Sequence, residues 1–393
     1  MMEPKIRFKG FDGEWKASTI GDFCSVSIGE FVIKTKQNDN APYPVYNGGS
    51  SYTGFYENYN QEGPKVIVSA RGANAGFVNY CEKNFWAGNS CYSIATKDNR
   101  NLKFLYHCLK KNQSNYLNNQ QAANIPSISK KDIQETILVM PKSFEQQAIA
   151  SYFTSLDSQI SASTSRLTSL KQMKAASLQT MFPQEGETVP KIRFKGFEGE
   201  WKTCPLSSIA TMHARIGWQN LRKDEFMSNG DYYLITGTDF NDGKISFETC
   251  HYIDKERYDQ DKNIQLEIDS ILITKDGTLG KVAFVDSLDK PATLNAGVFN
   301  VRPKDKEIYP KYLFQYLKAP YLMDYVDKNA TGGTIKHLNQ NMLVNFPVQH
   351  PSYKEQEKIG DYLFNLDHQI TLQTQRLEKL KQIKSACLDK MFV

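Results

Sequence analysis

This chain of 393 residues lacks several features that mark common classes of protein. No stretch approaches the roughly eighteen consecutive apolar residues of a membrane-spanning helix, and the opening MMEPKIRFKG has no apolar core like that of a secretory signal. The seven cysteines are an odd number and form no C-x-x-C pair, which argues against a disulfide framework and against a zinc site. A cytoplasmic location, where thiols stay reduced, is therefore expected.

Motifs of nucleotide-dependent and metal-dependent enzymes are also missing. The glycine-rich stretches RGANAG (71–76) and KDGTLGK (275–281) have neither G-x-G-x-x-G nor P-loop spacing, and the apolar runs around them indicate strand-turn-strand. NIPS (124–127) has too few prolines, and no aromatic residue, for the DPPY-type base pocket of an adenine methyltransferase. The six histidines are scattered, without metal-ligand spacing. We expect no metal, no cofactor and no catalytic residue in this chain.

Charge is nearly balanced. The net charge of +5 permits binding to a polyanion without demonstrating it. Apolar and charged residues make up 40% and 23% of the chain, as in an ordinary folded protein, and the length predicts two or three domains.

What the chain does contain is an internal repeat. PKIRFKGFDGEWK (4–16) returns as PKIRFKGFEGEWK (190–202), and residues 145–182 match residues 355–392 with half of the positions identical. The offset between copies grows from 186 residues at the front to 210 at the back, so the second insert is 24 residues longer. The inserts between these frames are unlike in sequence: YPVYNGGSSYTGFYENYN follows one frame, where YYLITGTDFNDGKISFE follows the other.

The repeated segment after each insert predicts a long helix with an apolar seam of period 3.5, as in a coiled coil. The seam positions are Ile149, Phe153, Leu156, Ile160, Ser163, Leu167 and Leu170 in the first copy, and Ile359, Leu363, Leu366, Ile370, Gln373, Leu377 and Leu380 in the second. Capping boxes are predicted at Ser143 with Gln146 and at Ser352 with Glu355, one position apart in the alignment. Each helix of about 38 residues spans roughly 57 Å and needs a partner.

The obvious partner of each helix is the other copy, packed antiparallel about a pseudo-twofold axis. Only PQEGETV (183–189) joins Phe182 to the second PKIRFKGF, so by symmetry Phe392 is expected beside Pro4, closing the chain into a ring. The alternative is that the helices dimerise two copies of the protein. From Ser158 to Gln184 the first helix carries bases and no acid, which suits its C-terminal dipole or a surface facing DNA or partner subunits.

These features together resemble the specificity subunit of Type I restriction-modification enzymes. The resemblance covers the whole chain and rests on the doubled PKIRFKGF opening, on P-x-x-x-EQ at the helix entries (Pro141 and Pro351), and on the L-D-x-Q-I stretches. It implies an α+β fold in which two mixed α/β target recognition domains are separated by two long antiparallel coiled-coil helices, in a pseudo-twofold circular arrangement. The expected divisions are 1–141 and 184–350 for these domains, with 142–183 and 351–393 for the helices.

The resemblance also implies partners and a division of labour. Each domain would read one half of an asymmetric bipartite sequence in double-stranded DNA, and the helices would fix the unread spacer and dock two methyltransferase subunits. S-adenosylmethionine would be bound by those subunits, and ATP and magnesium by further restriction and translocation subunits. This chain would itself be non-catalytic and would have no contact with a membrane.

Polar loops in the two inserts are the expected DNA contacts, because Asn and Gln pair with adenine, Lys and Arg pair with guanine, and small residues let the backbone approach phosphates. The structural alternative is that these polar residues cap helices or close hairpins. Arg71 and Lys275 are expected in equivalent turns of the two inserts, which suggests a phosphate or base contact for each. The expected DNA-binding residues are Asn47, Arg71, Asn74, Asn89, Gln121, Asn124, Ser127 and Lys130 in the first insert, and Arg215, Lys275, Thr278, Gly332, Gly333, Thr334, Lys336 and His337 in the second.

The main rival function is a scaffold whose helices assemble partners and whose inserts bind protein or carbohydrate. Salt dependence separates the two, because a DNA reader with several phosphate contacts loses affinity steeply as the salt concentration rises.

Overall fold

The structure is a computed structural model, and it describes residues 3–98, 100–118, 126–216, 221–275, 279–304, 306–329 and 338–393. The chain divides into two compact units: unit 1 is Met1–Arg166 with Thr374–Val393, and unit 2 is Leu167–Gln373. Each unit therefore contains a part of each long helix, because an apolar stripe is buried by neighbours in space and not by neighbours in sequence. The expected linear division into domains and helices stays a prediction.

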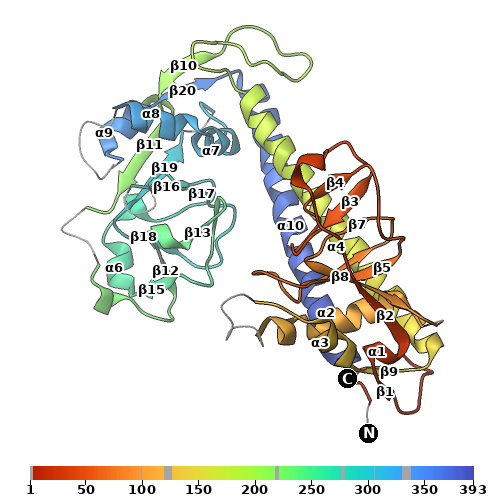
Figure 1. Cartoon of the computed structure of the whole chain (residues 1–393). Coiled ribbons are helices and arrows are strands. Elements are labelled where there is room, and N and C mark those ends of the chain that lie inside the picture. The colour runs from red at the N-terminus through yellow and green to blue at the C-terminus, as the bar shows by residue number, and fades with distance from the viewer. Residues whose placement is uncertain are drawn as a thin grey trace. The chain divides into compact units, whose positions relative to one another are not determined.

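Unit 1 contains a four-stranded sheet, a three-stranded sheet and a two-stranded sheet (Figure 1). The four-stranded sheet has the order β2-β8-β5-β6, with bounds Cys24–Ile28, Cys91–Thr96, Lys65–Ser69 and Val78–Cys81. The others are β4-β3-β7 (Gly54–Tyr56, Tyr43–Tyr46, Trp86–Ala87) and β1-β9 (Lys16–Thr19, Ile137–Met140). Its short helices are α1 (Ile20–Phe23), η1 (Lys34–Lys36), α2 (Leu102–Asn118) and α3 (Lys130–Glu135).

Unit 2 repeats this strand order. Its sheets are β11-β19-β16-β17 (Ala210–Ala214, Val298–Pro303, Ile271–Thr274, Val282–Phe284), β15-β12-β18 (His251–Ile253, Tyr232–Ile235, Ala292–Leu294) and β10-β20 (Lys202–Pro205, Pro347–His350). It adds the hairpin β13-β14 (Phe240–Asn241, Lys244–Ile245). Its short helices are α5 (Leu206–Ile209), η3 (Lys223–Glu225), η4 (Gly237–Asp239), α6 (Lys255–Asp259), η5 (Lys262–Ile264), α7 (Pro310–Lys318), α8 (Tyr321–Asn329) and α9 (Gln340–Val344).

The two inserts thus share one fold despite their unlike sequences. In each insert the central strand of the three-stranded sheet, β3 or β12, pairs with one antiparallel and one parallel neighbour. The predicted strand-turn-strand units are confirmed as β5-β6 and β16-β17. Residues 310–329 form two helices, α7 and α8, and not one, because Ala319 precedes Pro320 and takes an extended conformation (ψ 163°).

The repeated PKIRFKGF segment fastens each sheet domain to the entry of its long helix. In unit 1 the Arg7 guanidinium forms two hydrogen bonds of 2.7 Å to the buried carboxylate of Glu145. The same guanidinium donates to the backbone carbonyls of Asp12 and Gly13, both at 2.8 Å. Unit 2 repeats the contact, since Arg193 binds Glu355 at 2.6 and 2.8 Å. The opening motif and the EQ motif recur together because their side chains form one buried ion pair.

This ion pair corrects the expected capping boxes. Glu355 binds Arg193 and Gln146 donates to the Pro141 carbonyl at 2.9 Å, so neither side chain caps the helix start. The first backbone turn of the second long helix starts at Ser352, as expected, but that of the first starts at Lys142 rather than at Ser143. The two helices therefore start at aligned positions, Lys142 and Ser352, and the predicted start at Ser143 was one residue too late.

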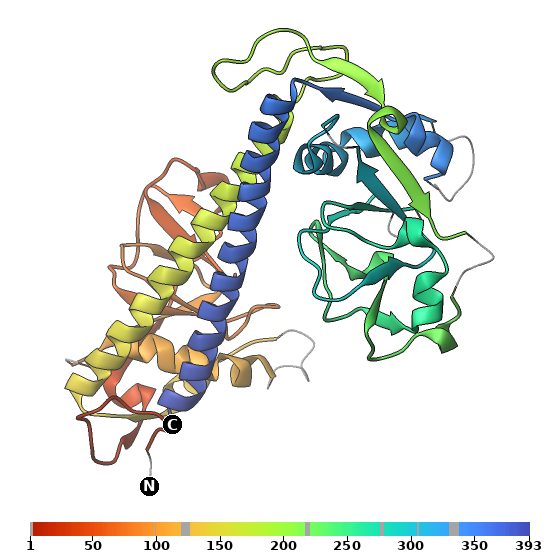
Figure 2. The same ribbon diagram turned by 180° about the vertical axis from the view of Figure 1, so that it is seen from behind.

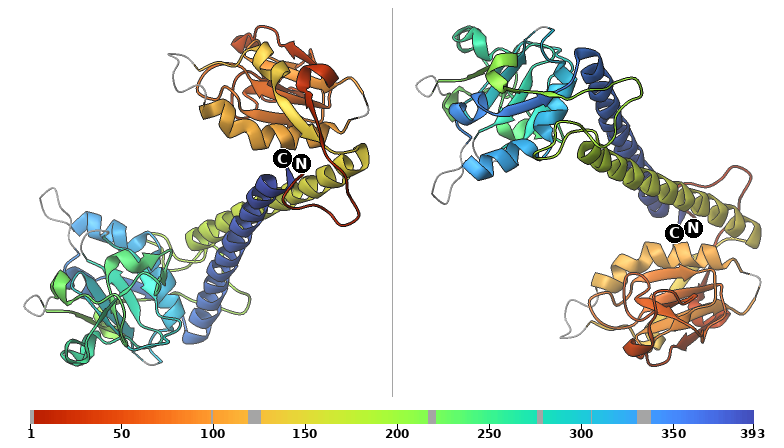
Figure 3. Two further views of the ribbon diagram at one scale, coloured as in Figure 1. Left: turned by 90° about the horizontal axis from the view of Figure 1, so that it is seen from below. Right: turned by 90° about the horizontal axis from the view of Figure 1, so that it is seen from above.

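Each long helix ends inside the unit formed by the other copy's insert. The helices are α4 (Ser143–Thr180) and α10 (Tyr353–Met391). Phe392 packs against Phe104 and Phe153 in the core of unit 1, with ring centroids 5.3 and 5.5 Å apart. The Ile6 amide donates to the Lys390 carbonyl at 2.9 Å, so the described N-terminal segment lies beside the end of α10 (Figure 3). The expected position of Phe392 beside the N-terminal segment is confirmed.

The end of α4 is held in the same way in unit 2. Phe182 is fully buried and its ring lies 5.6 Å from that of Tyr312 and 6.2 Å from that of Trp201. The Ile192 amide donates to the Thr180 carbonyl at 2.9 Å. The Met-Phe pair that closes each repeat is therefore a core element.

Within unit 1 the halves of α4 and α10 pack side by side in opposite directions (Figure 2). The Tyr152 hydroxyl lies 3.4 Å from Cys387 Sγ, and one turn further along α4 the Asp157 carboxylate pairs with Lys384. The partner number falls as the α4 number rises, which confirms antiparallel pairing within one chain.

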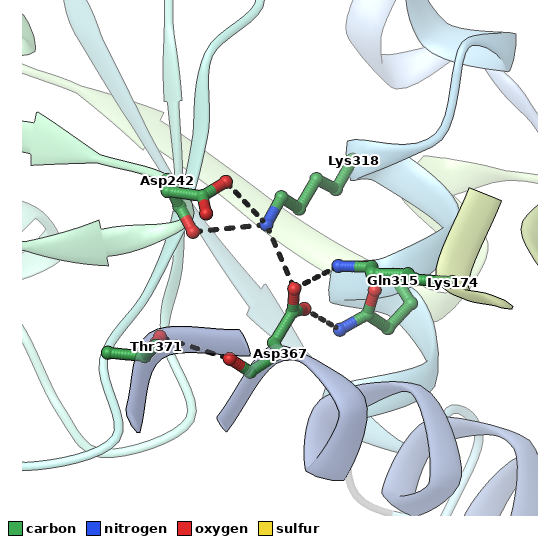
Figure 4. Close-up of polar contacts among 6 residues, drawn as sticks. All are labelled: Lys174, Asp242, Gln315, Lys318, Asp367 and Thr371. Atoms are coloured by element: carbon green, nitrogen blue, oxygen red, sulfur yellow. Dashed lines mark hydrogen bonds and ion pairs between the residues drawn. The ribbon is translucent and has the colours of Figure 1, made fainter. Parts of the chain in front are cut away.

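Unit 2 contains the matching contacts of the helix pair. The Ser177 hydroxyl lies 3.3 Å from the Tyr362 hydroxyl, and Lys174 forms an ion pair with Asp367 (Figure 4). Lys174 is buried, and its desolvation together with the nearby Lys318 lowers its pKa to about 8. Lys174 therefore binds Asp367 inside the helix pair and does not belong to a basic surface facing DNA or partner subunits.

Gln315 of helix α7 in unit 2 and His107 of helix α2 in unit 1 occupy equivalent positions. Gln315 donates to Asp367 at 2.8 Å, whereas His107 packs on the Phe153 ring at 5.0 Å and is 1% exposed. Burial, reinforced by Lys384, Lys103 and Lys110, lowers the pKa of His107 to about 3.

This burial predicts acid lability of unit 1. The unfolded chain binds a proton at His107 below pH about 6.5 and the folded chain does not, so stability falls by roughly 1.4 kcal/mol per pH unit between about pH 6.5 and 3. His107→Gln, which copies the second repeat, should flatten this part of the pH dependence. Thermal unfolding followed from pH 7 to 4 measures it, and an unchanged slope would contradict the assignment.

Candidate nucleic-acid interface

Four loops of unit 1 meet where strand β5 ends and strand β8 begins. The Ala70 amide donates to the Ser90 carbonyl at 2.8 Å, and the Ile128 amide donates to the Ala70 carbonyl at 2.9 Å. The Ser90 amide in turn donates to Asn47 Oδ1 at 3.2 Å. These bonds join the loops at 47–53, 70–76 and 88–90 and the segment 126–130, which ends at the first residue of helix α3, into one polar surface, which we call loop cluster 1.

Loop cluster 1 contains all the expected DNA-binding residues that the structure describes in the first insert. Arg71 is exposed and forms an isolated β-bridge with the exposed Ser127. Exposed Lys130 begins helix α3, whose amide at Asp132 is capped by Ser129 at 3.1 Å. Asn47, Asn74 and Asn89 are partly exposed. Contact of these side chains with DNA stays a prediction.

A neighbouring loop was missed in the sequence. After β2, the Glu30 amide donates to the Ala87 carbonyl at 2.8 Å, which places the loop beside residues 88–90. Gly29 makes this crossing possible, because a Cβ there would lie 2.2 Å from the Ala87 carbonyl oxygen. The loop then presents Phe31, whose side chain is 73% exposed, followed by exposed Lys34. The signal available in the sequence was the apolar run Phe31–Ile33 followed directly by the basic residues Lys34 and Lys36.

In unit 2 the turn after β16 corresponds to the turn after β5, as expected. Lys275 and Arg71, however, do not occupy equivalent positions in these turns. The Lys275 amide donates to the Gly297 carbonyl at 2.8 Å, as the Ala70 amide does to that of Ser90. Lys275 is therefore the counterpart of Ala70 and not of Arg71. Its ammonium lies 5.5 Å from the centroid of the Phe299 ring.

Arg215 occupies a different environment from the other expected contacts. It is 2% exposed, and its guanidinium donates to the Leu294 carbonyl at 2.8 Å and to the Gln260 side chain at 3.3 Å. Desolvation lowers the pKa of this guanidinium. A guanidinium held in this way could reach a base or a phosphate only by leaving these partners, so its position here is structural and the expected DNA contact does not fit it.

The remaining expected contacts lie outside the described residues. They are Gln121, Asn124, Thr278, Gly332, Gly333, Thr334, Lys336 and His337. Over the part of the chain that is described, no three His, Cys, Asp or Glu side chains are grouped as a metal site would need. Among the same residues, no helix is both long and apolar enough to cross a membrane.

The fold and the loop cluster define a class: two α+β domains of one topology, each built on part of a shared pair of long helices. The family model described as "Type I restriction modification DNA specificity domain" matches residues 12–172 and 198–382. The chain therefore belongs to the family of Type I restriction-modification specificity subunits, which are non-catalytic DNA-recognition subunits.

Individual relatives are distant. The EcoBI specificity subunit of Escherichia coli is 23% identical over 313 residues, which are 74% of this chain and 66% of that subunit. The EcoR124I/EcoR124II specificity subunit of E. coli is 24% identical, covering 86% of this chain and 83% of its own. The crystal structure of an S subunit from Mycoplasma genitalium has the same fold, with a TM-score of 0.74, 20% identity, and coverage of 100% and 99%.

Proposed function

We propose that each unit reads one half of an asymmetric bipartite DNA sequence, while α4 and α10 set the length of the unread spacer. The observation that carries this proposal is the identical strand order of two inserts whose loops differ. A shared scaffold with unlike loops suits two readers of the same kind with different specificities, since binding residues concentrate on loops while strands supply the frame.

The chemistry of loop cluster 1 supports this role. Its side chains include amides and a guanidinium, the groups that pair with base edges in the major groove, and hydroxyl and ammonium groups that bind phosphates. The exposed Phe31 and Lys34 beside it supply apolar and basic contacts of the same kind. Two such readers would meet grooves about one helical turn apart, roughly 34 Å along the duplex.

The helices would also dock two methyltransferase subunits, one for each copy of the repeat. The family membership and the relatives' names, which are those of restriction-enzyme specificity subunits, support this arrangement. S-adenosylmethionine would then be bound by the methyltransferase subunits, with ATP and magnesium on restriction and translocation subunits. This chain would supply sequence recognition and spacing.

Exchange of one insert tests the proposal. Replacing residues 17–140 by the corresponding insert of another family member should change one half of the methylated motif and leave the other half unchanged. The motif is measured by mapping methylated adenines in DNA from cells that co-express the chain with its methyltransferase. Exchange of the second insert is the matched control and should change the opposite half. A change in both halves after either exchange would contradict independent reading.

A further inference from the structure

Unit 1 contains an open groove between helix α2 and helix α4. It has a volume of about 660 Å³ and is lined by Tyr80, Tyr106 and His107 on one side and by Asp157, Ser158 and Ser161 on the other. All of these residues belong to unit 1. We call this hollow the α2–α4 groove.

The corresponding place in unit 2 is closed. Phe284 is the counterpart of Tyr80, because each is the third residue of its edge strand, and Phe314 is the counterpart of Tyr106. The hollow between Phe284, Phe314 and Asp367 has a volume of only about 10 Å³. The difference arises from the turn of the hairpin β13-β14, which lies in this place, and from Phe364 and His368 of α10, which lie where α4 has Thr154 and Ser158.

The hairpin turn is bound by specific contacts. The Lys318 ammonium donates to the Asp242 carbonyl at 3.0 Å (Figure 4). The Phe284 amide donates to the Gly243 carbonyl at 3.0 Å. Gly243 has φ +88°, and a Cβ there would lie 3.0 Å from the Phe314 ring. Lys318 also lies 3.5 Å from the Asp242 carboxylate. Unit 2 thus covers its own groove with an acidic Asp-Gly turn.

Unit 1 has the surface on which the turn packs in unit 2, but it has no hairpin to cover that surface. Residues 47–64, which join β3 to β5, are all described, and β4 is the strand that they form. Strand β6, which carries Tyr80, is the edge of its sheet, and an edge strand can pair with an incoming backbone. The Phe284 amide, which donates a hydrogen bond to the turn in unit 2, therefore has a counterpart in the Tyr80 amide at the sheet edge of unit 1.

The ionised side chains that line the α2–α4 groove are Lys103, Glu82 and Asp157. Each carboxylate already has a lysine beside it, since Glu82 lies 3.4 Å from Lys103 and Asp157 is paired with Lys384. An acidic occupant is indicated by unit 2, where Lys318 binds the Asp242 turn. The counterpart of Lys318 in helix α2 is Lys110.

One buried polar atom is also left for a ligand. His107 Nδ1, in a side chain that is 1% exposed and lines the groove, has no hydrogen-bond partner among the described residues. A buried polar atom of this kind is costly unless something bonds to it.

We propose that the α2–α4 groove binds an acidic hairpin turn of a methyltransferase subunit, in the place that the Asp242-Gly243 turn takes in unit 2. This rests on the proposed function, which supplies the methyltransferase as the partner. The unit 2 groove is filled by the chain itself, so only one of the two methyltransferase copies gains the contact. The two copies therefore bind with unequal affinities.

Filling the groove tests this inference in the full-length chain. Ser161→Arg places a long side chain in the groove and keeps a good helix former on α4. Titration with the methyltransferase, read by native mass spectrometry, should show two binding steps for the wild type. We expect the variant to weaken the tighter step about tenfold or more and to leave the weaker step unchanged. Ser161→Ala, and Ser169→Arg on an exposed part of α4 outside the groove, are the controls and should keep both steps.

A charge reversal provides an independent reading if the arginine variant folds poorly. Lys103→Glu should also weaken the tighter step, while Lys103→Arg should retain it, because an acidic turn needs the positive charge. Unchanged affinity in both Ser161→Arg and Lys103→Glu would overturn the inference, and so would equal weakening of both steps. If the wild-type chain binds no methyltransferase at all, the proposed docking function itself is wrong.

Discussion

Replacing Glu355 by alanine should lower the free energy of unfolding of unit 2 by about 3–5 kcal/mol, the usual cost of leaving one partner of a buried ion pair alone. The Glu355 side chain is fully buried, and both of its oxygens accept hydrogen bonds from Arg193. Arg193 also holds the loop through the carbonyls of Glu198, at 3.0 Å, and Gly199, at 2.7 Å. Removing the carboxylate therefore leaves a guanidinium that is 14% exposed without its counter-ion.

Denaturant unfolding of the full chain measures this loss, and two variants calibrate it. Glu145→Ala removes the matching pair in unit 1 and should cost a similar amount. Glu378→Ala removes an exposed pair with Lys381, with both side chains more than half exposed, and should cost about 1 kcal/mol or less. A loss for Glu355→Ala no larger than that for Glu378→Ala would show that the ion pair does not fasten the helix entry.

The second large effect is expected on the DNA motif. Inserting four residues after Ser163 in α4 adds about 6 Å of helix. If α4 and α10 set the distance between the two readers, the unread spacer should lengthen by one or two base pairs of about 3.4 Å each. Ser163 and Gln373 are buried seam positions, so inserting four residues after Gln373 as well keeps the ion pairs on both sides in register.

Methylated-motif mapping reads the spacer directly, because both half-sites appear in the modified sequence. The same four residues placed in the linker at Gly186 lengthen no helix and should leave the spacer as it is. An unchanged spacer in the doubly extended chain would refute the role of the helices in spacing. A changed half-site sequence would instead mean that the insertion disturbs the readers.

Several features of this fold were predictable because they depend on local periodicity and repetition. The 3.5-residue seam predicts two long helices, and two similar seams in one chain predict their antiparallel pairing, which the contacts of Asp157 with Lys384 and of Lys174 with Asp367 confirm. The short connection after Phe182 places that residue next to the second frame, and symmetry places Phe392 beside the first. Family membership followed from the same repeated segments.

Other features depended on contacts between distant residues, which local patterns do not reveal. The sequence pattern predicts that Glu355 is a capping residue, yet it binds Arg193, which lies more than a hundred positions away in the sequence. Arg215 looked like a surface contact, yet its guanidinium is buried against the Leu294 carbonyl. Lys275 and Arg71 looked equivalent until the strand register set them one position apart.

The duplicated architecture, the helix pair and the class of protein could be inferred from the amino-acid sequence, since each follows from spacing along the chain. Three other features became visible only in the folded chain: the unlike inserts share one strand order, four loops of unit 1 meet in a single cluster, and one groove is open where the Asp242-Gly243 turn occupies its counterpart. Strand pairing and the packing of a turn against a helix join residues far apart in sequence, and the register of those contacts is set only when the whole core closes.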